Sequence, residues 1–214
     1  VFIAYLLNPR DLRDPLFNEI GWLRIGQAAV NVQFLSDIFS AQLVYVPVPF
    51  DPILPAAGTR FDPLSQSAAT ASLARRGFLA RDWNRFWEYG EGGGRVAARF
   101  PFGLDLSGFG YTHWARAPAF SLEPNAAAAG GVQLGPVRQR VESVGMGAAQ
   151  DLTHGIVARA DAVVHFDQPA SEVTALTATP RLFTQVQVIA GADYTHESQF
   201  SVGAQYHFQN ELPS

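Results

Sequence analysis

The chain contains no cysteine and no lysine, and few of its residues are charged. Without cysteine it forms neither a disulfide framework nor a thiolate metal site. Charged residues make up 16% of the 214 residues, against about 25% in ordinary globular chains. All 15 basic residues are arginine, the net charge is −4 and no block of the sequence is basic, so nucleic acid is not expected as a partner.

The sequence also lacks any apolar run near the ~18 residues that a membrane-crossing helix needs, although 48% of its residues are hydrophobic. A helical membrane span is therefore not expected. Strands that cross a membrane leave no such run, because only every second residue of a strand faces lipid. Alternation of polar and apolar residues is the pattern that would indicate strands of this kind.

The clearest alternation lies near the end of the chain. Its polar members are Gln199, Ser201, Gly203, Gln205, His207 and Gln209, and its apolar members are Phe200, Val202, Ala204, Tyr206 and Phe208. A similar run lies between Leu182 and Tyr194, and only residues 195–198 separate the two. Because a period of two gives a strand one polar and one apolar face, the two runs predict an antiparallel hairpin.

The same rhythm predicts an all-β fold with about eight strands in four antiparallel hairpins. The expected strands are Leu23 to Leu35 with Ser40 to Val48, Gly92 to Pro101 with Leu104 to Ala117, Val137 to Gln150 with Gly155 to Asp167, and Leu182 to Tyr194 with Gln199 to Gln209. Longer connections are expected over residues 49–91, 118–136 and 168–181. Short turns that alternate with long loops are typical of an up-and-down transmembrane β-barrel in the outer membrane.

Strand length and the placement of aromatic residues favour a membrane barrel over a soluble sandwich. The expected strands reach about 10 residues, enough for a tilted strand to cross the hydrocarbon layer, whereas soluble strands average about 5 or 6. Small aliphatic residues occupy the middle of the apolar face, and aromatic residues such as Tyr194 and Phe208 lie towards its ends, which resembles an aromatic girdle. A soluble β-sandwich stays an alternative, because its strands alternate too.

Charged residues on the polar side of the expected strands predict the lining of a barrel lumen. An arginine that faced lipid at the middle of the membrane would cost about 2–4 kcal/mol, so these residues are expected to face inwards. The candidates are Arg95, Arg99, Arg138, Arg140, Glu142, Arg159, Asp161, His165, Asp167 and Asp193. Rows of arginine opposite carboxylates would orient and filter solutes, or the same residues would pair across strands and fill a narrow interior.

Two segments outside the expected strands carry their own predictions. Residues 49–91 form a connection too long for a simple turn, and such loops are usually functional, so a loop or plug is expected there. The segment with Asn8, Arg10 and Asp11 is either a polar anchor folded into the lumen or a helix cap and turn, and the cap is the preferred interpretation. Residues 1–7 look like the end of a strand, so residues 1–214 are expected to be one barrel domain or a fragment of one.

Several short motifs resemble a known group of proteins. They are Asn8-Pro9-Arg10-Asp11-Leu12, Val44-Tyr45-Val46-Pro47 and the proline-rich stretch from Phe50-Asp51-Pro52 to Phe61-Asp62-Pro63-Leu64. Together with the hairpin rhythm, these residues resemble large porin-like bacterial outer-membrane barrels of the alginate-export-like kind. The resemblance implies a single-chain barrel of more than eight strands with a polar lumen and a role in transport or export. This chain is short for a whole member of that group.

The sequence offers little support for catalysis. Its five histidines are scattered over turns and separate strands, so no metal site is expected, and no Gly-x-Ser-x-Gly elbow is present. Barrel enzymes need not carry that elbow, which leaves a membrane hydrolase as a minor alternative to a protein that is not an enzyme. The expected function is a bacterial outer-membrane channel that passes or exports small hydrophilic or anionic solutes by diffusion, without a cofactor. The alternative is a non-conducting barrel that serves as a membrane anchor or binding scaffold, and a homo-oligomer is compatible with both.

Overall fold

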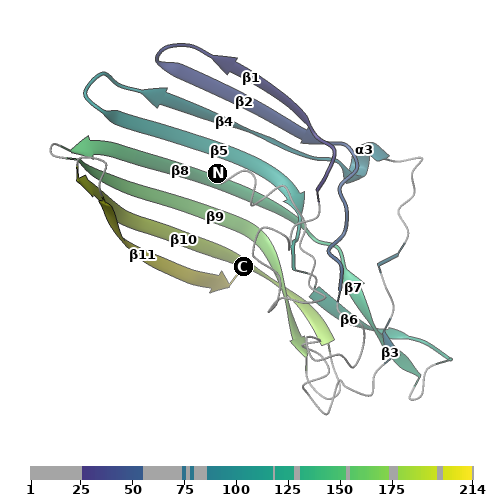
Figure 1. The fold of residues 1–214 in the computed structure, drawn as a ribbon. Helices are drawn as coiled ribbons and strands as arrows, with labels where there is room; N and C mark the ends of the chain where they lie inside the picture. Colours follow the sequence, from purple (N-terminus) through teal and green to yellow (C-terminus); the bar gives the residue numbers. More distant parts are fainter. Residues whose placement is uncertain are drawn as a thin grey trace.

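Most of the described chain belongs to one large antiparallel sheet. The computed structural model describes residues 26–54, 74–75, 78–79, 86–117, 119–127, 131–152, 155–173, 178–196 and 200–213. The sheet has eight strands in the order β1-β2-β4-β5-β8-β9-β10-β11 (Figure 1). Their bounds are β1 Val30–Leu35, β2 Phe39–Val46, β4 Glu91–Arg99, β5 Leu104–Trp114, β8 Arg140–Leu152, β9 Ile156–Val173, β10 Ala178–His196 and β11 Phe200–Pro213. The predicted all-β, antiparallel, eight-stranded fold is confirmed.

The four predicted hairpins are also present, and each pairs neighbouring strands of the sheet. They are β1–β2, β4–β5, β8–β9 and β10–β11, and their tight turns gather at one end of the sheet (Figure 1). Gly103 and Gly155 supply the left-handed backbone of two turns, with φ of 82° and 75°, which a residue without Cβ adopts at no steric cost. We call this end the tight-turn end.

The opposite end carries structure in a segment that was expected to be a plain connection. Within residues 118–136 and just beyond, β6 (Ala119–Pro124) pairs with β7 (Val132–Val137). The short β3 (Ala74–Arg75) runs parallel to β7 and completes a three-stranded sheet. Pro136 is tolerated in β7 because β3 pairs only with Gln133 and Leu134, so the missing N–H of proline breaks no bond to β3. A single helical turn, α3 (Phe86–Tyr89), precedes β4.

The expected loop over residues 168–181 is instead an extension of the hairpin formed by β9 and β10. The two strands stay paired as far as Val173 and Ala178. Asp167 adopts a φ of 57°, and the pairing register shifts between Phe183 and Gln185, which marks a β-bulge. The bulge bends the hairpin off the main sheet and towards the three-stranded sheet, where Ser171 accepts a hydrogen bond from the backbone N–H of Phe120.

The pairing registers divide the side chains of the main sheet between two faces. We call the face that carries Val144, Ala162 and Val188 the apolar face, and the face that carries Ser143, Asp161 and Gln187 the polar face. Large apolar side chains on the apolar face are 41–69% exposed, so no second layer of described protein packs against them. They include Val30, Val32, Phe34, Leu43, Tyr45, Val96, Leu106, Val144, Met146, Phe200, Val202, Tyr206 and Phe208.

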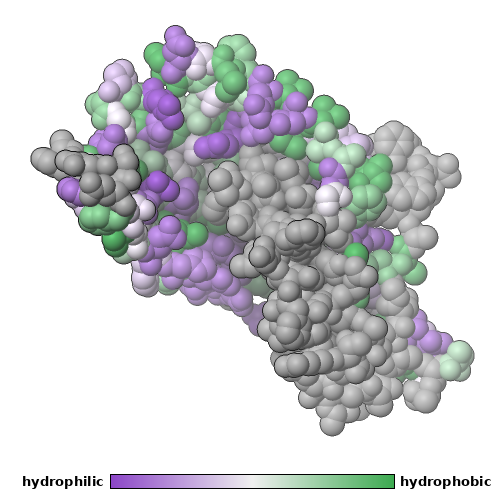
Figure 2. Space-filling view, in the orientation of Figure 1, coloured by the Kyte–Doolittle hydropathy of each residue, from purple (hydrophilic) through white to green (hydrophobic). Residues whose placement is uncertain are grey.

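The polar face is covered at one end and open at the other. Near β6 and β7 it holds fully buried side chains of both kinds, among them Val46, Glu91, Val141 and Ser143. Towards the tight-turn end its arginines are exposed. Figure 2 shows hydrophilic side chains gathered on the near face of the sheet over β10 and β11. This distribution is the reverse of that in a soluble sheet, whose apolar face is the buried one.

The described strands form an open sheet that does not close into the predicted barrel. Among the described residues, β1 and β11 form the two edges, and each has a neighbouring strand on one side only. No described helix is long and apolar enough to cross a membrane.

Candidate functional site

A groove on the polar face, near the tight-turn end, brings together four of the predicted lining residues. It has a volume of about 490 Å³ and extends across β2, β4, β5, β8 and β9. Its floor is made of small side chains, because Ala97, Ser107 and Gly147 lie opposite one another on successive strands. The charged residues that line it are Asp37, Arg95, Arg99, Asp105, Arg159 and Asp161.

Two of the groove's arginines are held in ion pairs. Arg99 Nε lies 3.0 Å from Asp105 Oδ1, and these residues face each other directly across β4 and β5. Arg159 Nη2 lies 3.1 Å from Asp193 Oδ2 on β10. Both pairs are exposed to solvent, so their net contribution to stability is small. The predicted residues Arg99, Arg159 and Asp193 therefore pair across strands.

Two other groove residues carry no such partner. Among the described residues, neither Arg95 on β4 nor Asp161 on β9 forms an ion pair or a side-chain hydrogen bond. The carboxylate of Asp161 lies over Gly147, where a Cβ atom would collide with its Oδ1. Gly147 thus makes room for Asp161 to lean across β8 towards the middle of the groove.

The covered end of the polar face holds a buried carboxylate with several donors. The carboxylate of Glu91 accepts hydrogen bonds from Arg116 at 2.9 and 2.6 Å, from the backbone N–H of Trp114 at 3.0 Å and from the hydroxyl of Tyr111 at 3.4 Å. Glu91 is 0% exposed. Because all of its acceptor positions are used, this cluster ties the start of β4 to the end of β5 and is satisfied as a unit.

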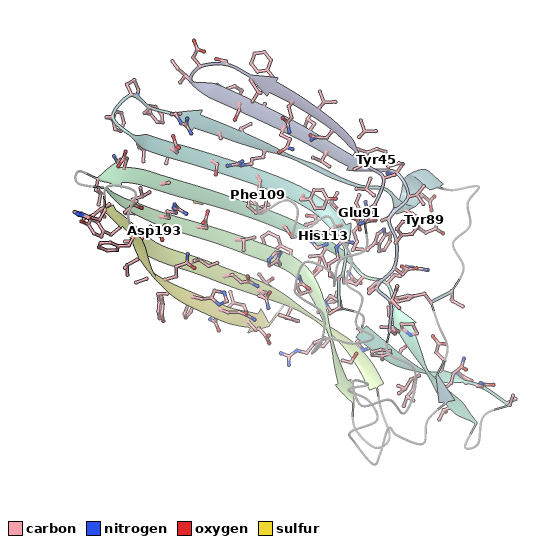
Figure 3. The ribbon with its side chains drawn as sticks, viewed as in Figure 1. Tyr45, Tyr89, Glu91, Phe109, His113 and Asp193 are labelled. Atoms are coloured by element: carbon pink, nitrogen blue, oxygen red, sulfur yellow. The ribbon has the colours of Figure 1, made fainter. Side chains whose placement is uncertain are left out.

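A second buried chain of hydrogen bonds crosses three strands beside Glu91. The carbonyl of Trp114 accepts from His113 Nδ1 at 2.9 Å, so in the neutral ring Nε2 accepts from the Ser143 hydroxyl at 3.0 Å. This bond uses the single hydroxyl hydrogen of Ser143. His165 Nδ1 therefore donates to Ser143 Oγ, at 2.7 Å. Figure 3 shows Glu91 and His113 close together at this end of the sheet and Asp193 at the other.

The Ser143–His113 pair has the geometry of a nucleophile and base, but its surroundings close it off. Ser143 is 1% exposed, its oxygen is shared with His165, and a backbone carbonyl rather than a carboxylate holds His113 Nδ1. In the part of the chain that the structure describes, no cluster of three or more His, Asp or Glu residues is arranged to hold a metal. The geometry of this cluster is that of a structural network.

Several predicted lining residues lie elsewhere. Arg140 and Glu142 are on the apolar face, because Glu142 is paired with Thr112 and Phe166 and Arg140 with Trp114. Within the described sheet they therefore share the face of Val144 and Met146, not that of Arg95 and Arg159. The row formed by Thr112 and Glu142 ends the band of apolar side chains on this face. Arg140 lies just beyond that row and donates hydrogen bonds to the Thr112 hydroxyl and to the backbone carbonyls of residues 88 and 90.

The remaining predicted residues have individual positions. Arg138 lies between β7 and β8 and forms a two-pronged ion pair with Asp51, at 2.9 and 2.6 Å. His165 faces the polar side but is buried in the network with Ser143. Asp167 is the exposed residue of the bulge in β9. The predicted segment with Asn8, Arg10 and Asp11 lies outside the described residues, as does most of the expected loop or plug at 49–91.

The buried clusters were missed by sequence reasoning, apart from His165. Glu91, Tyr111 and Ser143 come from separate strands, and Tyr111 and His113 lie in a strand, Leu104–Trp114, that carries apolar residues on both sides. One usable signal was the position of His165 in the alternation of its strand. It lies on the same side as Asp161 and is paired with Ser143 on the neighbouring strand. Comparison of the chain with family models, with curated proteins and with solved structures gives no match.

Proposed function

We propose that the sheet is part of the wall of a transmembrane β-barrel in a bacterial outer membrane, with its apolar face against lipid and its polar face lining a channel. The channel passes or exports small hydrophilic or anionic solutes by diffusion and needs no cofactor. Membrane lipid and the solutes are its partners, nucleic acid is not, and a homo-oligomer is compatible with the proposal. The resemblance to porin-like, alginate-export-like barrels points the same way.

The observation that carries the proposal is the inverted placement of polar and apolar side chains. A soluble sheet that exposed Phe34, Met146 and Tyr206 by 62–69% would carry an apolar patch far larger than monomeric soluble proteins tolerate. In a bilayer the same face is favourable, because lipid replaces water as its neighbour.

The extent of the apolar face fits this placement. On β10, every second residue from Val186 to Tyr194 belongs to the apolar face, a span of about nine residues, as a tilted strand needs to cross a bilayer. Polar Thr112 and Glu142 mark one limit of the band. At the tight-turn end, Tyr194, His196 and Phe200 form an aromatic cluster with ring centroids 5.5–6.2 Å apart, in keeping with an interfacial girdle.

An outer-membrane setting also explains where the loops lie. Outer-membrane barrels have short turns at one end and longer loops at the other, and the described hairpins place the strand ends that their short connections join at the same end of the sheet. The three-stranded sheet and the extension of β9 and β10 belong to the opposite end. Barrels in lipid must be closed, because unpaired backbone groups are costly there, so the proposal requires strands beyond β1 and β11 at both edges.

A non-conducting scaffold is the second candidate, and the burial of the polar face near β6 and β7 favours it. Glu91, His113, Ser143 and His165 are at most 6% exposed, as expected of a filled interior. The open groove with its exposed arginines favours the channel instead. The two candidates therefore differ in whether solute passes from the groove beyond the buried clusters.

Conductance separates these functions. We would fold the protein in detergent, check its β-structure by circular dichroism and insert it into planar lipid bilayers. The channel predicts steady single-channel steps. It also predicts that Ala149→Trp, on the polar face, lowers the conductance, whereas Ala148→Trp, on the apolar face of the same strand, does not. Silence of a correctly folded sample supports the scaffold, and purification without detergent as a monomer supports a soluble sandwich.

A further inference from the structure

The residues that line the groove carry equal numbers of positive and negative charges, and Asp193 beside them adds one more carboxylate. Three arginines and three aspartates line it. Arg99 is neutralised by Asp105, and Arg159 by Asp193 on the adjoining strand. A site built for anions alone would carry an excess of positive charge. This balance points to solutes that themselves carry both signs of charge.

Arg95 and Asp161, which have no ion-pair partner among the described residues, lie on opposite sides of the groove. Three strand spacings separate Arg95 on β4 from Asp161 on β9, which corresponds to about 14 Å between the strand axes. Asp161 leans over Gly147 and so brings its carboxylate towards Arg95. The pairing registers also place Asp161 two residues along the strands from Arg95, because Asp161 lies in the row of Gly147, Ser107 and Ala97. A solute that contacts both charges therefore spans the groove obliquely.

The floor between these charges leaves the gap free. Ala97, Ser107 and Gly147 project little from the sheet, and the Ser107 hydroxyl adds one polar group. The groove volume of about 490 Å³ lies in the usual range of small-ligand sites, roughly 300–1,000 Å³. Asp37, the other lining carboxylate without an ion pair among described residues, lies on the turn at the mouth of the groove, farther along the strands from Arg95.

We propose that this groove binds small zwitterions, with a carboxylate of the solute at Arg95 and its ammonium group at Asp161. A solute with one charge satisfies only one of these residues and leaves the other uncompensated. A solute with both charges at its ends, such as an amino acid or a short peptide, satisfies both. The inference rests on the proposed function and narrows its substrate class from hydrophilic solutes in general to dipolar ones.

Binding to the protein folded in detergent micelles tests the inference by titration calorimetry at low ionic strength. The probes are glycylglycine, acetate and ethylammonium. Glycylglycine is expected to bind more tightly than either ion. Arg95→Gln is expected to weaken glycylglycine and acetate but not ethylammonium, and Asp161→Asn to weaken glycylglycine and ethylammonium but not acetate. The expected losses are roughly three- to tenfold, as for a single partly exposed charge contact.

Two control variants remove the same charges outside the groove. Arg181→Gln and Glu211→Gln lie on β10 and β11, away from the lining residues, and are expected to leave all three affinities unchanged. The inference is overturned if glycylglycine binds no better than the single ions, or if Asp161→Asn leaves its affinity unchanged. The second result would define an anion site only. The comparison of the three probes on the unaltered protein decides the matter even if a variant fails to fold.

The same experiment separates failure of this inference from failure of the proposed function. Glycylglycine binding without any single-channel current would leave the groove assignment intact and contradict the channel. Current without preference for glycylglycine would leave the channel intact and contradict the zwitterion site.

Discussion

The carboxylate of Glu91 and the guanidinium of Arg116 form a two-pronged ion pair in which Nη1 and Nη2 lie 2.9 and 2.6 Å from the two carboxylate oxygens. The pair is buried, since the side chain of Glu91 is 0% exposed and that of Arg116 is 12% exposed. Glu91 opens β4, whereas Arg116 follows the end of β5. The pair therefore fixes the covered end of the polar face, and its strength is open to measurement.

Glu91→Ala is expected to destabilise the folded protein by about 3–5 kcal/mol, because it leaves the charge of Arg116 buried without a partner. Urea unfolding from lipid vesicles, followed by tryptophan fluorescence, measures the change. Asp105→Ala is the matched control, because it removes a carboxylate from the exposed pair with Arg99 and is expected to have no measurable effect on stability. Equal effects of the two substitutions would refute the assignment of Glu91 to a buried cluster.

Gly93 and Gly110, on neighbouring strands but opposite faces, are expected to respond differently to the same change. A Cβ at Gly93 would collide with the backbone oxygen of Gly110 and with Tyr111, whereas a Cβ at Gly110 meets nothing within 4 Å. Gly93→Ala is therefore expected to cost about 1–3 kcal/mol, as other overpacked positions do. Gly110→Ala is expected to be neutral or stabilising by up to ~1 kcal/mol. The same urea titration checks both, and a neutral Gly93→Ala would contradict the close packing of β4 on β5.

Ala148 and Ala149 test the two faces with adjacent residues of the same type. Ala148 is paired with Leu106 and Ala160 on the apolar face, and Ala149 with Asp105 and Arg159 on the polar face. In vesicles, Ala148→Arg is expected to cost about 2–4 kcal/mol, the cost of arginine facing lipid near the middle of the membrane. Ala149→Arg faces the groove and is expected to change the free energy of unfolding much less. The reverse order would mean that the polar face is the one in contact with lipid.

Much of the main sheet follows from the period of two in the sequence. From Phe200 to Gln209 the alternation is unbroken, and from Ala158 to Phe166 only Val163 departs from it. The pairing of β9 and β11 keeps the polar and apolar members of each run on opposite faces. The short turn before Leu104 was predicted and contains Gly103 with positive φ, whereas Gly155, which was expected to begin a strand, also has positive φ. Strand pairing is local in each hairpin, so the sequence is sufficient to define it.

Other parts depend on tertiary contacts that no local pattern contains. Arg140 and Glu142 alternate as lining residues would, but they lie at the limit of the apolar band, on the same face as Val144. The bulge at Asp167 lets β9 continue where a loop was expected. Ser143 gains its role only because β8 lies between β5 and β9, which brings together histidines far apart in the sequence.

The alternation of β10 offers the most direct measurement of which face contacts lipid. Because the chain has no cysteine, single cysteines at positions 186 to 193 can each carry a spin label in protein folded into vesicles. The account predicts that collisions with oxygen, which concentrates in lipid, peak at Val186, Val188, Ala190 and Ala192. Collisions with a water-soluble nickel complex should peak at the residues between them. The absence of alternation, or water access at the four apolar positions, would contradict a membrane-facing sheet.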